Sequence, residues 1–243
     1  MKRRELLRGA GLAAVAAGLA ACGARPLGFT LALTLPRVEA PWLADFARGL
    51  FQLADEHDCE LIGGDTTAGP LAIGITVFGE VPPGQALLRS GAHPGDDLWV
   101  SGTPGEARLA LEAFRGRLSL SAEHFEVARR AMECPQPRVA LGLGLRGLAT
   151  AAADVSDGLL GDLSHILKAS GVGAHIDTHI TSNLIAEKAY LSGGNGHFGL
   201  EFIRQCTLAG GDDYELAFTA PPARRDAVAA ASQASGTPVT RIG

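Results

Sequence analysis

Hydrophobic side chains recur along the chain with two periods, and these periods predict a mixture of helices and strands. Trp42, Phe46 and Leu50 lie near helical spacing, which predicts an amphipathic helix over residues 41–55. Further helices are predicted over residues 106–114, 123–132, 139–152 and 222–232.

Apolar runs bounded by turn-forming residues predict the strands. They cover residues 29–35, 71–81, 98–101, 214–219 and 239–242. Leu61 and Ile62 are predicted as a short buried strand that leads into a turn at residues 63–67. Residues 174–177 are strand-like, and residues 181–199 are predicted as irregular with room for one short helix. Because helices and strands do not alternate strictly, we expect an α+β fold rather than a doubly wound sheet.

The most informative stretch runs from Ala153 to Asp162. Helical spacing of the leucines after it predicts a helix that begins near Ser156 or Asp157, with free N–H groups beside several carboxylates. An aspartate N-cap is the simpler interpretation. Three acids within nine residues favour a second interpretation, a metal site, because carboxylates bind Mg²⁺ and Mg²⁺ binds phosphate. The stretch is therefore a candidate metal–nucleotide site.

Two other turns combine glycines with acids. Asp65 follows two glycines and precedes two threonines, which supplies hard oxygen ligands, although such a segment alone is often a plain turn. The segment 210–215 has the same character and precedes a strand. Arg89 is the candidate cation that would bind a phosphate. The alternative interpretation is that Arg89 is an ordinary surface arginine. The three turns together favour one shared metal site.

Composition and charge narrow the function. The chain has 243 residues, of which 47% are hydrophobic and 19% charged, as in a globular protein with one large or two modest domains. A net charge of -5 argues against a nucleic-acid surface. The four cysteines form no C-x-x-C pair, so neither zinc nor a disulfide framework is indicated. The two G-x-G-x-x-G matches, at 142–147 and 194–199, follow no predicted strand and are not read as dinucleotide sites.

The N-terminal segment has two interpretations. Arg3-Arg4, a Gly/Ala-rich run and the sequence before Cys22 are similar to a twin-arginine lipoprotein signal over residues 1–21, which would mean export and membrane attachment. The other interpretation is an Ala-rich helix over residues 6–22 that packs on the first domain of a cytoplasmic protein. We favour the second interpretation.

Six stretches carry a family resemblance over nearly the whole chain after residue 19. They are AACGARPLGFTLALTLP (20–36), LIGGDTT (61–67), ALLRSGAHPGDDLWVSGTPGEA (86–107), PRVALG (137–142), AADVSDGLLGDLSHIL (152–167) and LAGGDDYELAFTAP (208–221). In this combination and order they resemble the thiamine-monophosphate kinase family, in the superfamily of aminoimidazole ribonucleotide synthetase and selenophosphate synthetase.

The resemblance implies a two-domain aminoimidazole ribonucleotide synthetase-like fold that forms a homodimer, with ATP and several Mg²⁺ ions between the domains. The domains would be a leader-like or Ala-rich segment at 1–24, a partial N-terminal α/β domain at 25–82 and a C-terminal α+β domain at 83–243. Family members carry a further acidic motif upstream and a segment downstream, so the N-terminal domain is expected to be incomplete. The site residues implied by the resemblance are Gly64, Asp65, Arg89 and Ser156 for the nucleotide, Asp65, Asp154 and Asp157 for metal, and Asp212 for the substrate.

The implied reaction is the ATP-dependent phosphorylation of thiamine monophosphate to thiamine diphosphate. Its nucleophile is a phosphate oxygen, so no catalytic His, Ser or Cys group is expected. Two alternatives stay open at this point. One is a sister activity such as selenophosphate synthesis, and the other is a truncated protein that binds nucleotide or metal without turnover.

Overall fold

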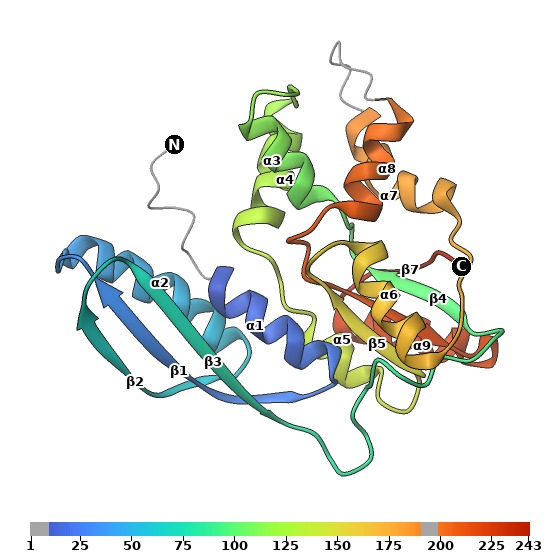
Figure 1. The fold of residues 1–243 in the computed structure, drawn as a ribbon, viewed down its shortest axis with the longest axis horizontal. Coiled ribbons are helices and arrows are strands. Elements are labelled where there is room, and N and C mark those ends of the chain that lie inside the picture. Colours follow the sequence, from blue (N-terminus) through green and yellow to red (C-terminus); the bar gives the residue numbers. More distant parts are fainter. Residues whose placement is uncertain (1–9, 191–198) are drawn as a thin grey trace.

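The computed structural model describes residues 10–190 and 199–243, which form two sheets with helices packed on them (Figure 1). The first part comprises α1 (Ala10–Ala21), β1 (Arg25–Leu35), α2 (Ala40–Glu56), β2 (Glu60–Ala68) and β3 (Ala72–Glu80). The second part comprises β4 (Asp97–Ser101), α3 (Glu106–Phe114), α4 (Ala122–Glu133), α5 (Val139–Gly144), β5 (Ala151–Val155), α6 (Leu159–Ser170), α7 (Thr178–Tyr190), α8 (Leu200–Ala209), β6 (Glu215–Ala220), the 3₁₀ turn η1 (Pro222–Arg224), α9 (Arg225–Ser235) and β7 (Val239–Arg241).

The first sheet has the strand order β2-β1-β3, with β2 parallel and β3 antiparallel to β1. Its covered face packs on α2, where Phe29 and Leu33 are buried against Phe46 and Leu50, as the helical spacing of α2 predicts. α1 lies on the same side of the sheet (Figure 1).

The other face of this sheet is open. Phe78 is 47% exposed there, and the strand β2, which contains Ile62 at 60% exposure, is exposed along its whole length. Register places Phe78 opposite Gly28, and the side chain of Ile62 lies over Gly28. An uncovered apolar sheet face is a surface that proteins normally bury against something.

The second sheet is antiparallel, with the order β5-β6-β4-β7. Both of its faces are covered, so side chains of one strand alternate between two cores. Leu216 and Phe218 of β6 pack with α5 and α9, whereas Ala217 packs with Leu163 and Ile166 of α6. This two-sided burial fixes α6 firmly against β5, the strand that leads into the acidic stretch.

Helix α1 packs between the two parts of the molecule (Figure 1). It contacts β3 of the first sheet as well as α5 and β5 of the second part, and its Ala17 and Ala20 are fully buried. Small side chains allow this close approach from two sides. The expected Ala-rich helix is therefore confirmed over Ala10–Ala21, but it packs on both parts and not on the first alone. Residues 6–9 of that prediction lie outside the described residues.

No helix within residues 10–190 and 199–243 has the length and apolar character needed to cross a bilayer.

One predicted helix differs from the structure around the second sheet. The helix predicted over residues 139–152 ends at Gly144, and Ala151–Val155 is the strand β5. Gly147 has a φ of +69°, which ends helical geometry, and the alanines that follow are good helix formers that pair with β6 instead. Burial on both faces of the sheet overrides their helix propensity.

The second half of the chain differs from the prediction in three further places. Residues 174–177 form no strand, although the amide of Asp177 donates a hydrogen bond to the carbonyl of Ile242 at 2.7 Å. The region predicted as irregular contains the helix α7, while its residues 191–198 lie outside the described residues. Helix α8 was not predicted, although Ile203 and Cys206 are buried at helical spacing.

Candidate functional site

Two of the three predicted glycine-and-acid turns meet backbone to backbone. The amide of Asp212 donates to the carbonyl oxygen of Ser156 at 2.8 Å, and the amide of Tyr214 donates to Val155 at 2.8 Å. A Cβ atom on Gly211 would lie 2.8 Å from the Ser156 oxygen, so only glycine allows this approach. The sequence-predicted residues Asp154, Ser156, Asp157 and Asp212 are thereby gathered at one end of β5 and β6.

Helix α6 begins at Leu159, two or three residues later than the start predicted near Ser156 or Asp157, because Gly158 has a φ of +115°. The aspartate N-cap interpretation is also wrong, since Gly158 holds the cap position without a side-chain bond. Instead, the amides of Ser156 and Asp157 both donate to Oδ2 of Asp162, each at 2.9 Å. The turn before α6 is thus closed by a carboxylate from the first turn of the helix itself.

Electrostatic effects show that the carboxylates of this region lie close together. Burial raises the pKa of Asp162, the two backbone hydrogen bonds lower it, and Asp154 and Asp157 raise it further. The pKa of Tyr214 is raised to about 12. Burial is the largest cause, the charge and hydrogen bond of Asp212 come next, and the charges of Asp154 and Asp157 add to them. Each added negative charge opposes ionisation of its neighbours.

Tyr214 and Asp212 carry backbone strain at this point. Their φ values are +53° and +65°, in the left-handed region that is unusual for residues other than glycine. The Tyr214 hydroxyl donates to Oδ1 of Asp212 at 3.2 Å. Such strained positions persist where surrounding contacts hold them, and they are common in functional sites.

Arg89 approaches the same region from the segment between the two sheets. Its charge and that of Asp154 both act on Cys22, which follows α1, so the three side chains lie in the same region of the molecule. Burial and Asp154 raise the pKa of the Cys22 thiol, and Arg89 lowers it. The segment is held by the amide of Leu87, which donates to Cys22, and by the carbonyl of Leu88, which accepts from Ala152 of β5.

The third turn lies elsewhere. Gly64 and Asp65 are inside β2, in the first sheet, and not in a turn after a buried strand as predicted. β2 is also exposed, not buried, because the sheet is open on one face. Gly64 serves the close approach to β1, where a Cβ atom would lie 2.0 Å from the Leu31 carbonyl. Among the described residues no three acidic, His or Cys side chains are close enough to hold one metal ion. The role of Asp65, Asp154 and Asp157 as metal ligands stays a prediction.

The remaining residues fit a magnesium ion that also binds phosphate. Asp154 is half-buried and Asp157 is exposed, so both carboxylates can reach a ligand. Neither forms an ion pair with any described Arg, Lys or His. Mg²⁺ is commonly held by one or two protein carboxylates together with water and substrate phosphates. In such a site it would neutralise the charge of the phosphates and of the two aspartates.

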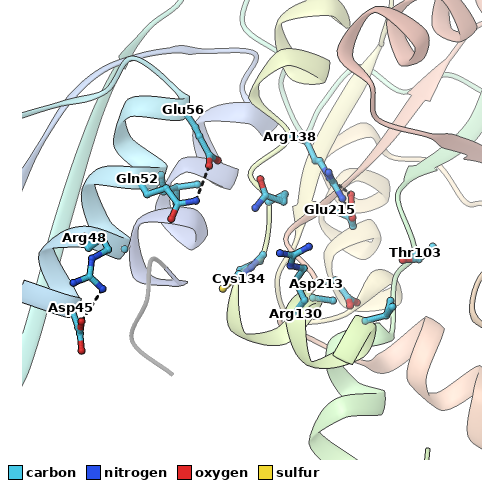
Figure 2. Close-up of a pocket in the computed structure, with 16 residues that line it drawn as sticks. Asp45, Arg48, Gln52, Glu56, Thr103, Arg130, Cys134, Arg138, Asp213 and Glu215 are labelled. Carbon is cyan, nitrogen blue, oxygen red and sulfur yellow. Dashed lines mark hydrogen bonds and ion pairs between the residues drawn. The ribbon is translucent and has the colours of Figure 1, made fainter. Parts of the chain in front are cut away.

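A separate cavity of about 690 Å³ lies between α2 and the segment after α4 (Figure 2). None of the predicted site residues lines it. On one side are Asp45, Arg48, Gln52 and Glu56 of α2, and on the other are Arg130, Cys134, Arg138, Asp213 and Glu215.

The wall of this cavity is built by buried ionic contacts. Arg138 donates to both carboxylate oxygens of Glu215, at 2.8 and 2.5 Å, and the Ser101 hydroxyl donates to the same carboxylate. Asp213 accepts from the amide of Gly105 at 2.8 Å, and burial raises its pKa well above the usual range. These contacts tie β6 to the start of α3 and to the segment before α5. We assign these contacts a structural role, which is to hold β6 in place next to the turn that contains Asp212.

The chain matches the models of a known protein family in two consecutive stretches. Residues 9–81 match the model of the AIR synthase related protein, N-terminal domain, and residues 93–243 match that of the AIR synthase related protein, C-terminal domain. The chain belongs to this family.

Within the family, the chain is similar to thiamine-monophosphate kinases. That of Salmonella typhimurium is 44% identical over 228 residues, which cover 93% of this chain and 67% of the relative. The crystal structure of the kinase from Stenotrophomonas maltophilia K279a matches with a TM-score of 0.90 and 44% identity, covering 99% of this chain and 76% of the other. A structure of AaThiL complexed with AMPPCP and TMP matches with a TM-score of 0.75 and 28% identity, covering 91% of this chain and 70% of the other.

Sequence reasoning missed the contributions of Asp162, Tyr214 and Cys22. Asp162 was counted among the acids, but nothing in the sequence shows that its carboxylate accepts from the two amides before the helix. Tyr214 was assigned to a strand, and Cys22 to the end of the Ala-rich helix. Only the packing of α1 against β5 brings Cys22 beside Asp154 and Arg89.

Proposed function

We propose that the chain catalyses the ATP-dependent phosphorylation of thiamine monophosphate to thiamine diphosphate. Identity of 44% with thiamine-monophosphate kinases over 93% of the chain carries this proposal. The gathered residues Asp154, Ser156, Asp157 and Asp212, with Arg89 nearby, are of the types that handle a metal-bound polyphosphate.

The chemistry needs positioning more than proton transfer. A phosphate oxygen of thiamine monophosphate attacks the γ-phosphorus of ATP and forms a new P–O bond. The bond from that phosphorus to the β,γ-bridging oxygen breaks, and its electron pair leaves on ADP. The attacking oxygen is already ionised at neutral pH, so no general base is required.

The residues have separate roles in this proposal. Asp154 and Asp157 hold Mg²⁺, which supplies charge neutralisation for the two repelling phosphates when it is bound. Arg89 contacts the nucleotide phosphates, and Ser156 donates to the nucleotide. Asp212 contacts the substrate, with its side chain oriented by Tyr214. Gly64 and Asp65 contribute from the first sheet, and Asp65 reaches the metal only through closer approach of the two parts or through a second copy.

We also propose a homodimer formed through the open face of the first sheet. The exposed Ile62 and Phe78 lie on that face, and their burial in a second copy would remove a large apolar surface from water. Phe78→Glu should then shift sedimentation from dimer to monomer, whereas Leu200→Glu, on α8, should leave it unchanged. A wild-type monomer at micromolar concentration would contradict the dimer.

A cytoplasmic location follows from the same proposal, since the phosphate donor is ATP. Removal of α1 as part of a leader would also expose the apolar residues that pack on Ala20 and Leu12. The intact mass of the untagged protein tests this point. A product that begins at a lipidated Cys22 would contradict it.

The activity itself is tested by offering different acceptors with the same ATP and excess Mg²⁺. We expect ADP release with thiamine monophosphate, and none with thiamine or selenide above the background without acceptor. Asp154→Asn is the matched control, because it changes one proposed metal ligand and keeps its shape. Release that depends on selenide would favour a sister activity, and ATP binding without any release would favour the non-catalytic alternative.

A further inference from the structure

Helix α6 lies between the two halves of the proposed nucleotide site. Its first turn follows the Asp154–Asp157 turn, and its last residue, Ser170, contacts the segment that carries Arg89. Leu159, Leu163 and Ile166 are buried against the second sheet, so the helix is fixed along its length. It is therefore placed to set the distance between the acidic turn and Arg89.

At the first turn the contact is made by Asp162. This side chain is 4% exposed, and its Oδ2 atom accepts both the Ser156 and the Asp157 amide at 2.9 Å. The two donors belong to the residues proposed for the nucleotide and the metal. One buried oxygen that accepts two neighbouring amides fixes the peptide planes there, and with them the directions in which the Ser156 and Asp157 side chains leave the backbone.

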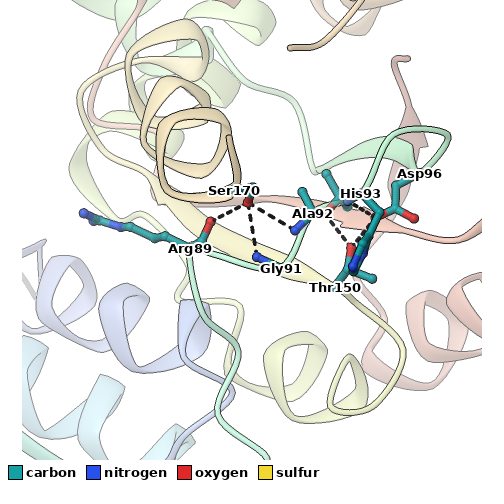
Figure 3. A network of polar contacts seen from close by, with 8 residues as sticks. Arg89, Gly91, Ala92, His93, Asp96, Thr150 and Ser170 are labelled. Atoms are coloured by element: carbon teal, nitrogen blue, oxygen red, sulfur yellow. Dashed lines mark hydrogen bonds and ion pairs between the residues drawn. The ribbon is translucent and has the colours of Figure 1, made fainter. Parts of the chain in front are cut away.

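At the last residue the contact is made by the Ser170 hydroxyl (Figure 3). It accepts from the amides of Gly91 and Ala92, at 3.2 and 3.1 Å, and donates to the carbonyl of Arg89 at 3.3 Å. One hydroxyl has one proton and two lone pairs, so these three bonds use its full capacity. In Figure 3 the Arg89 side chain extends away from this network, which leaves its guanidinium available.

The Arg89 segment is also confined from the opposite side. Gly91 has a φ of +125°, and a Cβ atom there would lie 2.5 Å from the carbonyl oxygen of Thr150. Oδ2 of Asp96 accepts from the amide of His93 at 2.9 Å and from the hydroxyl of Thr150 at 2.7 Å (Figure 3). The backbone at Arg89 is thus held between α6 and the start of β5.

We propose that α6 is the positioning element of the site, with Asp162 holding the Ser156–Asp157 backbone and Ser170 holding the Arg89 backbone. The two positioning residues are eight positions apart, which corresponds to about 12 Å along a helix. This span separates the backbone of the proposed metal-binding turn from that of the phosphate-binding arginine. The inference rests on the proposed nucleotide site, because neither residue touches the reacting groups.

Conservative substitutions separate positioning from charge. Asp162→Asn keeps an acceptor oxygen and loses the charge, and Asp162→Ala loses both. We expect Asp162→Ala to raise the KM for Mg·ATP by about tenfold, with Asp162→Asn within about threefold of wild type.

Ser170→Ala should raise the same KM by about fivefold, and Ser170→Thr should restore it. The KM for thiamine monophosphate should change little. Ser164→Ala is the control on the same helix, since its hydroxyl bonds only the carbonyl of Gly161.

Hydrogen exchange gives a readout that does not depend on turnover. Asp162→Ala should accelerate amide exchange at Ser156 and Asp157, and Ser170→Ala should accelerate it at Gly91 and Ala92, in variants whose circular dichroism matches wild type. Unchanged exchange would overturn the positioning contacts, whether or not the protein is a kinase. The positioning contacts would also be overturned if Asp162→Asn raised the KM for Mg·ATP as much as Asp162→Ala, because the effect would then come from the lost charge and not from the lost acceptor oxygen. Loss of all ATP binding and turnover in wild type would instead count against the proposed function.

Discussion

The amide of Asp212 donates a hydrogen bond to the carbonyl oxygen of Ser156 at 2.8 Å, which joins the turn after β5 to the turn before β6. These turns are far apart in the sequence, and each contains glycines where the other comes close. The contact brings the proposed substrate residue beside the proposed nucleotide residue. Several expected outcomes depend on this junction.

Gly211→Ala should disrupt the junction, because the new Cβ atom would lie 2.8 Å from the Ser156 oxygen. We expect a loss of about 1–3 kcal/mol in the free energy of unfolding and weaker Mg·ATP binding. Gly161→Ala is the matched control, since no atom lies within 4 Å of a Cβ atom there and α6 should gain stability. Equal unfolding midpoints for the two variants in urea would contradict the close approach.

Asp157→Asn should weaken Mg²⁺-dependent ATP binding by at least about tenfold, as expected for loss of a metal ligand. Titration calorimetry with and without Mg²⁺ measures the effect. Asp55→Asn, at the exposed end of α2, should bind as wild type does. Unchanged affinity in Asp157→Asn would remove this turn from the metal site.

Cys22 should report on occupancy of the site, because the residue is exposed, although its thiol is partly buried, and because the charges of Arg89 and Asp154 act on it. Its raised pKa means that less thiolate is present at pH 8 than in an ordinary cysteine, so its alkylation should be slower there and its rate should level off only at higher pH than for an ordinary cysteine. Arg89→Ala removes the charge that lowers this pKa, and alkylation should become slower. Mg·ATP should protect Cys22 as well.

Peptide mass spectrometry after timed alkylation measures both effects, with the exposed Cys134 as the internal reference. Arg224→Ala, a change of an exposed arginine on the turn before α9 whose charge does not act on this thiol, should leave the rate at Cys22 unchanged. Faster alkylation in Arg89→Ala would show that the arginine does not face the thiol.

Arg138→Ala should destabilise the protein by about 3 kcal/mol, because it leaves the buried Glu215 carboxylate without its cation. Arg48→Ala breaks an exposed pair with Asp45 and should cost less than about 1 kcal/mol. Urea unfolding of the two variants gives the comparison. A cost for Arg138→Ala as small as that for Arg48→Ala would argue against its structural role.

The sequence predicted most of the local structure and part of the site, for reasons that can be stated. α2 and α3 were predicted almost to their ends because one face of each is apolar at helical spacing. The strand β5 was not predicted, and its first two residues were placed at the end of a helix, since three alanines before Asp154 carry no strand signal until β6 pairs with them. The meeting of the Asp154 and Asp212 turns was predicted from their shared composition. The separation of Asp65 from them was not, because it depends on how the first sheet packs.

The central claim is that this chain transfers the γ-phosphate of ATP to thiamine monophosphate, and one measurement tests it most directly. Wild-type protein with ATP labelled in the γ-phosphate, Mg²⁺ and thiamine monophosphate should give labelled thiamine diphosphate and ADP in equal amounts, with no label in free phosphate beyond the rate without acceptor. Two results would contradict the claim. One is label found only in free phosphate, and the other is ATP that binds, as measured by calorimetry, but transfers no phosphate to thiamine monophosphate.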